Sequence, residues 1–187
     1  MLTNKISSNV ILTVTVLTIA VISVGQNTQT MLPMENPRIE IKKKLRRLKI
    51  FDGDKLIKTY KIAVGFAPNG DKRVEGDGKT PQGKFYVFTK NANSKFYLSL
   101  GLSYPNIEAA TRGLQEKVIS KEEYDAIIEA IGQKKMPLQK TALGGEIYIH
   151  GGGIRDDWTN GCIALRDEEI REIYDAIPVG AEVFVSE

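Results

Sequence analysis

The chain has 187 residues, which is enough for one domain with its own hydrophobic core and too few for two domains of typical size. The 26 basic and 23 acidic residues leave a formal net charge of +3, which suits an anionic surrounding such as a cell wall but does not by itself indicate nucleic-acid binding. The single cysteine excludes an internal disulfide. With only one histidine beside it, a zinc site made of protein ligands is not expected either.

Residues 1–25 differ from everything that follows. Residues 10–24 are almost entirely apolar and carry no charge, Lys5 precedes them, and Ser23-Val24-Gly25 supplies small residues of the kind found at cleavage sites. This pattern predicts a secretory signal peptide or an N-terminal membrane anchor, and so export to the periplasm or cell envelope, with a buried core helix as the alternative. Residues 26–37 are polar, contain two prolines and are predicted as a linker to one domain at 38–187.

Short β-strands dominate the first half of that domain. Apolar and polar residues alternate from Arg38, and the runs 45–51 and 55–64 flank Asp52-Gly53-Asp54, where Asp-Gly favours a tight hairpin turn. Residues 65–83 hold five glycines and two prolines and predict a loop. Further strands are expected at 84–88, 147–149 and 181–185.

A basic cluster lies at the first of these turns. Its members are Lys42, Lys43, Lys44, Arg46, Arg47 and Lys49. A contact with a polyanion is one interpretation; a solvated strand face and turn is the favoured one, because basic side chains also discourage pairing between sheet edges. Aromatic residues that would stack on bases are limited there to Phe51, so no nucleic-acid partner is expected.

Two helices are predicted. Ser120 and Glu123 have the spacing of a capping box, and apolar residues at helical spacing follow as far as Ile131. A second helix is expected to begin near Asp167, where acidic residues favour the positive end of the helix dipole, and to stop at Pro178. The composition of elements therefore predicts a mostly β domain with about two helices.

The only histidine and the only cysteine lie twelve positions apart, each beside glycine. A buried strand would deliver His150 at its end, and an imidazole within reach of Cys162 would lower the thiol pKa and act as its base. Backbone amides of Asn160 and Gly161 would face a developing oxyanion, and Trp158 would wall the site. The alternatives are an inert buried cysteine and a histidine with a purely structural hydrogen bond.

The same segment resembles the active-site signature of the L,D-transpeptidase catalytic domain, the YkuD family. The matching residues are His150-Gly151 followed by Thr159-Asn160-Gly161-Cys162-Ile163, and 157–165 is similar to one bacterial branch with an Asp-Trp-Thr signature. Upstream, 76–83 resembles the family's Gly-x-x-Thr-Pro-x-Gly segment, and 99–106 and 142–146 match the same branch in order. The resemblance implies a β-sandwich-like catalytic domain with a few short helices.

The chain departs from the family pattern in two respects. The interval between His150 and Cys162 is shorter than in many members, and Ala164 stands where many members have an arginine. If that arginine binds a substrate carboxylate, Arg155 or Arg166 would have to replace it.

The resemblance implies a cysteine-dependent L,D-transpeptidase that cross-links or remodels peptidoglycan and so affects cell shape. Cys162 would attack a stem peptide, His150 would act as base and acid, and the Gly151 carbonyl would orient the imidazole. Trp158 and Thr159 would contact substrate, and no metal or organic cofactor would be needed. The alternatives are a thiol carboxypeptidase or endopeptidase on wall peptides, and a wall-binding module without activity.

Overall fold

The computed structural model describes residues 34–187, and its backbone is dominated by one curled β-sheet. The eight strands are β1 (Pro37–Lys42), β2 (Arg47–Asp52), β3 (Lys55–Lys61), β4 (Gly83–Ser94), β5 (Tyr97–Leu102), β6 (Tyr148–His150), β7 (Ile163–Ala164) and β8 (Glu182–Ser186). Three helices complete the described part: α1 (Ile107–Gln115), α2 (Lys121–Gly132) and α3 (Asp167–Ala176). The predicted mostly β fold with a few short helices is confirmed.

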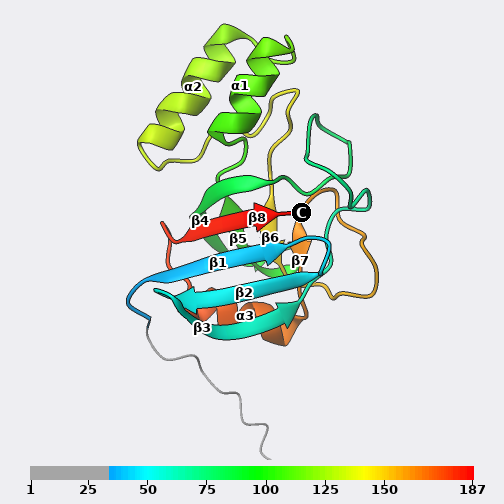
Figure 1. The fold of residues 1–187 in the computed structure, drawn as a ribbon, viewed down its shortest axis with the longest axis vertical. Coiled ribbons are helices and arrows are strands. Elements are labelled where there is room, and N and C mark those ends of the chain that lie inside the picture. The colour runs from blue at the N-terminus through cyan, green and yellow to red at the C-terminus, as the bar shows by residue number, and fades with distance from the viewer. Residues whose placement is uncertain (1–33) are drawn as a thin grey trace, which may run out of the picture.

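The strands follow the order β3-β2-β1-β8-β4-β5-β6-β7. The pairs β1–β8 and β6–β7 are parallel and the others antiparallel. The long strand β4 belongs to both halves of the sheet, since it pairs with β8 near its start and with β5 beyond Val87. Beyond β3, Ala63 exchanges two backbone hydrogen bonds of 2.9 Å with Ala164 of β7, so the sheet closes on itself at this end (Figure 1).

The main core lies within this curled sheet. Alternating residues of β1 and β2, such as Ile39, Ile41 and Leu48, point inward and are almost completely buried, as the period of two in a strand requires. The apolar face of α3 covers the same core with Ile170 and Ile173. This packing gives a rigid support to β6 and β7, the strands next to His150 and Cys162.

Helices α1 and α2 form a hairpin at the opposite end of the molecule from α3 (Figure 1). They share a separate small core around Ala110, Ile127 and Leu143. The predicted capping box is confirmed, because the Ser120 hydroxyl accepts from the Glu123 amide and the Glu123 carboxylate accepts from the Ser120 amide. The helix expected to begin near Asp167 is confirmed as α3.

Three elements were not predicted, α1, β5 and β7. Helix α1 begins at the N-cap Asn106, whose side chain accepts from the Ala109 amide, but Gly113 and the short length hide the periodicity. Gly113 is required by packing, because a Cβ there would approach the Leu143 side chain to 2.9 Å. Strand β5 carries Leu98, Leu100 and Leu102 in alternation with Ser99 and Gly101, so the strand pattern is present in its sequence although no strand was predicted there.

The basic cluster at the first turn is not simply a solvated face. Lys43 is fully buried, and its ammonium donates to the carbonyls of Gly70, at 2.5 Å, and Thr80, at 3.0 Å, and lies 3.5 Å from the Glu187 carboxylate. Burial lowers the pKa of Lys43, while Glu187 raises it. The prediction was wrong for this residue because the glycine-rich loop folds over the end of β1 and offers its carbonyls to the lysine.

The predicted signal peptide or anchor at 1–25 and most of the linker at 26–37 lie outside the described residues. Within the linker, Pro37 already belongs to β1. Among residues 34–187, no helix combines the length and the apolar character that crossing a bilayer requires.

Candidate functional site

The histidine and the cysteine lie at the same edge of the sheet because they belong to, or directly precede, parallel neighbouring strands. His150 is the last residue of β6 and Cys162 directly precedes β7, with Ile149 opposite Ile163 and His150 opposite Ala164. The eleven residues between them, four of which are glycines, return the chain to the same edge. Both side chains line one cavity of about 990 Å³.

The imidazole of His150 is held in one tautomer. Its Nδ1 lies 2.7 Å from the carbonyl oxygen of Gly151. A carbonyl only accepts hydrogen bonds, so Nδ1 carries the proton and Nε2 keeps a lone pair. Phe96 stacks on the ring at a centroid distance of 4.6 Å, and Trp158 meets it edge-on at 5.6 Å. Burial lowers the pKa of His150 against the opposite effect of the Gly151 bond, and the neutral form is favoured.

Cys162 is a protonated thiol in this arrangement. Its Sγ accepts from the Tyr148 amide and donates to the Glu146 carbonyl, both at 3.4 Å. Burial raises the pKa of Cys162 to about 11, and the Glu146 carboxylate adds to that rise, while the Tyr148 amide and Lys72 oppose it. The expected lowering of the thiol pKa is therefore not found, because desolvation outweighs the favourable neighbours.

The turn before the cysteine is closed by Thr159. Its hydroxyl donates to the Cys162 carbonyl at 2.7 Å and accepts from the Gly161 amide at 3.2 Å. Thr159 is buried at the cavity wall, so its polar group serves the turn. Gly161 has φ +120°, and a Cβ there would lie 2.7 Å from the Lys79 carbonyl oxygen, which explains the glycine. The Asn160 residue lines the cavity, whereas the Gly161 amide already has the Thr159 hydroxyl as acceptor.

Trp158 lines the cavity of Cys162. Its side chain is partly exposed, and its Nε1 donates to the Gly153 carbonyl at 3.1 Å. This bond folds the 150–162 loop back on itself and holds the indole ring beside His150.

The two candidate arginines do not line the cavity of Cys162. Arg155 is exposed on the far side of Trp158, in a shallow hollow with Phe96. Arg166 is exposed at the start of α3 and forms an ion pair with Glu169 at 2.9 Å. Ala164 is fully buried, so a longer side chain there would have no room. The basic side chains that do line the cavity belong to Lys72 and Lys140.

The Gly76–Gly83 segment packs against the turn that carries Cys162. The Thr80 hydroxyl accepts from the Gly65 amide at 2.9 Å and donates to the Cys162 carbonyl at 3.4 Å. Asp77 accepts from the Lys72 ammonium, at 3.0 Å, and from three backbone amides of its own loop. Burial would raise the pKa of this carboxyl, but these donors lower it below its usual range. The segment therefore supports the turn that carries Cys162 through hydrogen bonds.

An ion pair fixes the loop that carries Trp158. The Arg46 guanidinium donates to both carboxylate oxygens of Asp157, with Nε at 2.9 and 3.0 Å, and Asp157 also accepts from the Val64 amide at 3.0 Å. Arg46 reaches this carboxylate from the turn between β1 and β2. Residues far apart in the sequence are thus tied together next to the site.

Phe96 and Lys72 are the residues that sequence reasoning missed. Phe96 lies in the tight turn between β4 and β5, where no spacing marks it as a neighbour of the imidazole. Lys72 is 2% exposed although its surroundings in the sequence are polar. Only the charge of Asp77 five residues later gave a signal for it.

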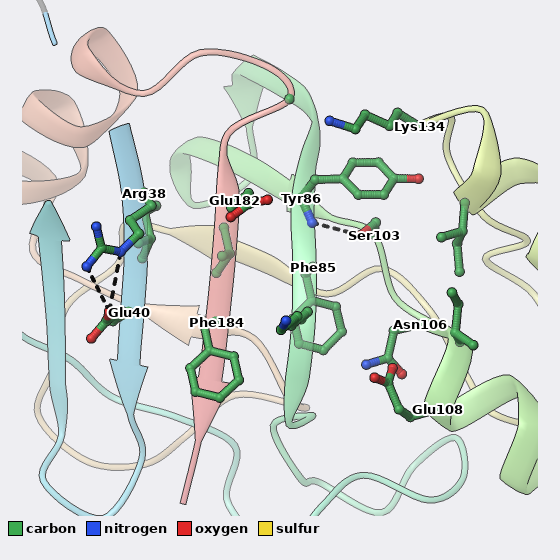
Figure 2. A pocket seen from close by; sticks show the side chains of 16 residues that line it. Arg38, Glu40, Phe85, Tyr86, Ser103, Asn106, Glu108, Lys134, Glu182 and Phe184 are labelled. Atoms are coloured by element: carbon green, nitrogen blue, oxygen red, sulfur yellow. Dashed lines mark hydrogen bonds and ion pairs between the residues drawn. The ribbon is translucent and has the colours of Figure 1, made fainter. Parts of the chain in front are cut away.

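A second cavity of about 350 Å³ lies between the helical hairpin and the outer face of β1, β8 and β4. Figure 2 shows Phe184, Phe85 and Tyr86 on the strand side, with Asn106 and Glu108 at the start of α1 and Lys134 just after α2 on the other side. It shares no lining residue with the cavity of Cys162. The thiol and imidazole chemistry is confined to the first cavity.

Within residues 34–187, no group of three or more histidine, cysteine, aspartate or glutamate side chains is arranged to hold a metal ion.

Comparison with known proteins identifies the family to which the chain belongs. The profile of the L,D-transpeptidase catalytic domain, YkuD, matches residues 36–185. The chain therefore belongs to the YkuD family of L,D-transpeptidase catalytic domains. Among curated protein sequences, none is significantly similar to it.

Solved structures share the fold. A variant of the helical cell shape determining protein Pgp2 from Campylobacter jejuni is 24% identical, with 82% of this chain and 48% of that chain covered and a TM-score of 0.58. Unmodified Pgp2 is 23% identical, with 81% and 48% covered and a TM-score of 0.57. Bd1075 from Bdellovibrio bacteriovorus is 18% identical, with 82% and 48% covered and a TM-score of 0.53. This chain spans about half the length of these structures, and the likeness is one of fold.

Proposed function

We propose that this protein is a cysteine-dependent L,D-transpeptidase that acts on peptidoglycan stem peptides outside the cytoplasm. The observation that carries the proposal is the pairing of Cys162 with a neutral, tautomer-fixed His150 in one cavity. Membership of the family supplies the substrate class. The apolar residues 10–24 agree with export, since the wall lies outside the cytoplasm.

The thiol and imidazole are proposed to react as a neutral pair. Rotation about the Cβ–Sγ bond turns the thiol hydrogen from the Glu146 carbonyl to Nε2 of His150, which removes it as sulfur attacks the peptide carbonyl carbon. The bond to the terminal D-residue then breaks, and its nitrogen takes the proton from Nε2. A thioester at Cys162 remains.

The second step regenerates the thiol. The amine of an acceptor stem attacks the thioester carbon, gives a proton to Nε2 and forms a new amide bond, while the sulfur leaves and is reprotonated by His150. If water takes the place of the amine, the same step is hydrolysis. The Asn160 amide is the proposed donor to the tetrahedral oxyanion, and a contribution from Gly161 requires the Thr159 hydroxyl to turn away.

The substrate carboxylate needs a basic partner in this scheme. Arg155 and Arg166 do not line the cavity, whereas Lys72 and Lys140 do. We therefore transfer the proposed carboxylate contact from the arginines to these lysines.

The proposal is tested with a disaccharide-tetrapeptide donor and mass spectrometry of the products. We expect release of the terminal D-amino acid and formation of a cross-linked dimer, both lost in Cys162→Ala. Cys162-dependent tripeptide without dimer would assign the protein to the hydrolases instead. An unchanged product pattern in Cys162→Ala would refute thiol catalysis.

A further inference from the structure

One peptide unit beside the imidazole is held at both of its ends. Its carbonyl, that of Gly151, accepts from His150 Nδ1 at 2.7 Å. Its amide, that of Gly152, donates to Asp167 Oδ1 at 2.8 Å. The carboxylate, the peptide group and the imidazole therefore form a continuous hydrogen-bonded chain that ends at the ring facing the cavity of Cys162.

We propose that Asp167 is a positioning residue that acts on His150 through the Gly151–Gly152 peptide group. A carboxylate bound to the N–H of an amide draws the hydrogen toward itself and increases the negative charge on the carbonyl oxygen of the same amide, as expected in a cooperative chain. The stronger acceptor holds the Nδ1 proton more firmly and stabilises the imidazolium that forms when Nε2 takes a proton. This inference rests on the proposed function only in its catalytic consequence.

The local geometry fits this role. A Cβ on Gly151 would lie 2.4 Å from Asp167 Oδ1 and 2.8 Å from the Phe96 carbonyl oxygen, so any side chain would displace the carboxylate. Gly152 has φ +97°, a conformation that glycine adopts at no steric cost and that sets the orientation of the peptide plane. The sequence Gly151-Gly152 is thus what the chain of hydrogen bonds requires.

The carboxylate itself is fixed by the start of α3. Asp167 is the first residue of this helix, where the unpaired amides and the helix dipole favour a negative charge. The helix start is closed by the bond from the Arg166 amide to the Glu169 carboxylate at 3.1 Å. Packing of α3 on the core then sets the distance between the carboxylate and the Gly152 amide.

Other charges around the imidazole must be considered in any test by pH. The ring is faced directly by the aromatic side chains of Phe96 and Trp158. The charged residues that line the same cavity are Lys72, Glu75, Glu123, Lys140 and Glu146. On the side of α3, the charged neighbours of Asp167 are Arg166, Glu168 and Glu169.

The single histidine makes the test direct. The imidazole of His150 is the only one in the chain, so NMR of the ring gives one titration curve and the tautomer in the free protein, with no need for turnover. The variants are Asp167→Asn, which keeps an acceptor and removes the charge, and Asp167→Ala. Glu168→Gln is the matched control, because it removes the same charge from an exposed residue in the same helical turn.

We expect Asp167→Asn to lower the pKa of His150 by roughly half a unit to one unit, Asp167→Ala to lower it at least as much, and Glu168→Gln to change it by less than about 0.2 units. The acid limb of the kcat/KM profile should move down in pH by the same amount. Equal shifts in Asp167→Asn and Glu168→Gln would overturn the proposal, since a general loss of charge would then explain both.

A measurement on the unaltered protein keeps the inference testable if the variants do not fold. The Gly152 amide proton should resonate far downfield at neutral pH and move upfield as the Asp167 carboxyl is protonated. A Gly152 amide insensitive to that titration would overturn the relay. If turnover is absent but both NMR results hold, the proposed function fails and the relay stands. If turnover is present but the NMR results are not found, the relay fails and the proposed function stands.

Discussion

Burial sets the starting state of the reactive pair at the scale of single residues. It raises the pKa of Cys162 to about 11 and lowers that of His150, so at neutral pH both groups are uncharged. A neutral pair avoids the cost of placing two ions in a poorly solvated site. The imidazole is then available as a base, which a preformed imidazolium would not be.

The thiol pKa has a consequence for stability that can be measured. Between the ordinary thiol pKa of 9.0 and about 11, the unfolded chain loses the proton of Cys162 while the folded chain keeps it. The folded state therefore binds more protons in this range, and stability falls as pH rises, by about 1.4 kcal/mol per pH unit from this group. Urea unfolding of the wild type and of Cys162→Ser should show this difference.

The comparison between the two proteins is the control, because lysines and tyrosines titrate in both. The stability of the wild type relative to Cys162→Ser should decline between about pH 9 and about pH 10.5 and stay constant below about pH 8. A relative stability that is flat across the whole range would mean that the folded thiol ionises as readily as the unfolded one.

At the scale of elements, loops carry the site residues and distant turns hold those loops in place. Arg46→Ala removes the guanidinium from Asp157, which leaves a partly buried carboxylate with the Val64 amide as its remaining hydrogen-bond donor among the contacts described above. We expect a loss of roughly 1–3 kcal/mol in the free energy of unfolding. The loop should also loosen around Trp158, the only tryptophan of the chain, and acrylamide should quench its fluorescence more strongly.

Arg47→Ala is the matched control for this experiment. Arg47 directly follows the turn as the first residue of β2, and within residues 34–187 its side chain donates only to the carbonyls of Leu45 and Arg46. Its variant should keep the quenching of the wild type. Equal quenching in both variants would show that the Arg46–Asp157 pair does not fix the loop.

The sequence predicts those elements whose signals are local. The capping box at Ser120 and the acidic start at Asp167 each depend on residues within one helical turn, and both helices are present. Strand β5 also has a local signal, since its leucines occupy every second position, and it was overlooked. The burial of Lys43 was not predictable, because it depends on partners from distant segments. Tertiary contacts decide such cases, and a single sequence does not contain their geometry.

At the scale of the whole molecule, one curled sheet brings the site together. Closure through Ala63 and Ala164 places the end of β3 against β7, and the parallel register of β6 and β7 aligns His150 with the residues after Cys162. The pairing of thiol and imidazole was predictable because each residue type occurs once. Three features could be seen only in the fold. Phe96 stacks on the imidazole, Asp167 accepts from the Gly152 amide, and both candidate arginines lie outside the cavity of Cys162.

The most direct test of the account is the intact mass of the protein during reaction with a tetrapeptide donor. We predict a transient mass increase equal to the donor minus its terminal D-amino acid, located at Cys162 by peptide mapping and absent from Cys162→Ser. Addition of an acceptor amine should remove this adduct, because the amine takes the acyl group from Cys162. Turnover of the donor without any adduct at Cys162, or with the adduct on another residue, would contradict the account.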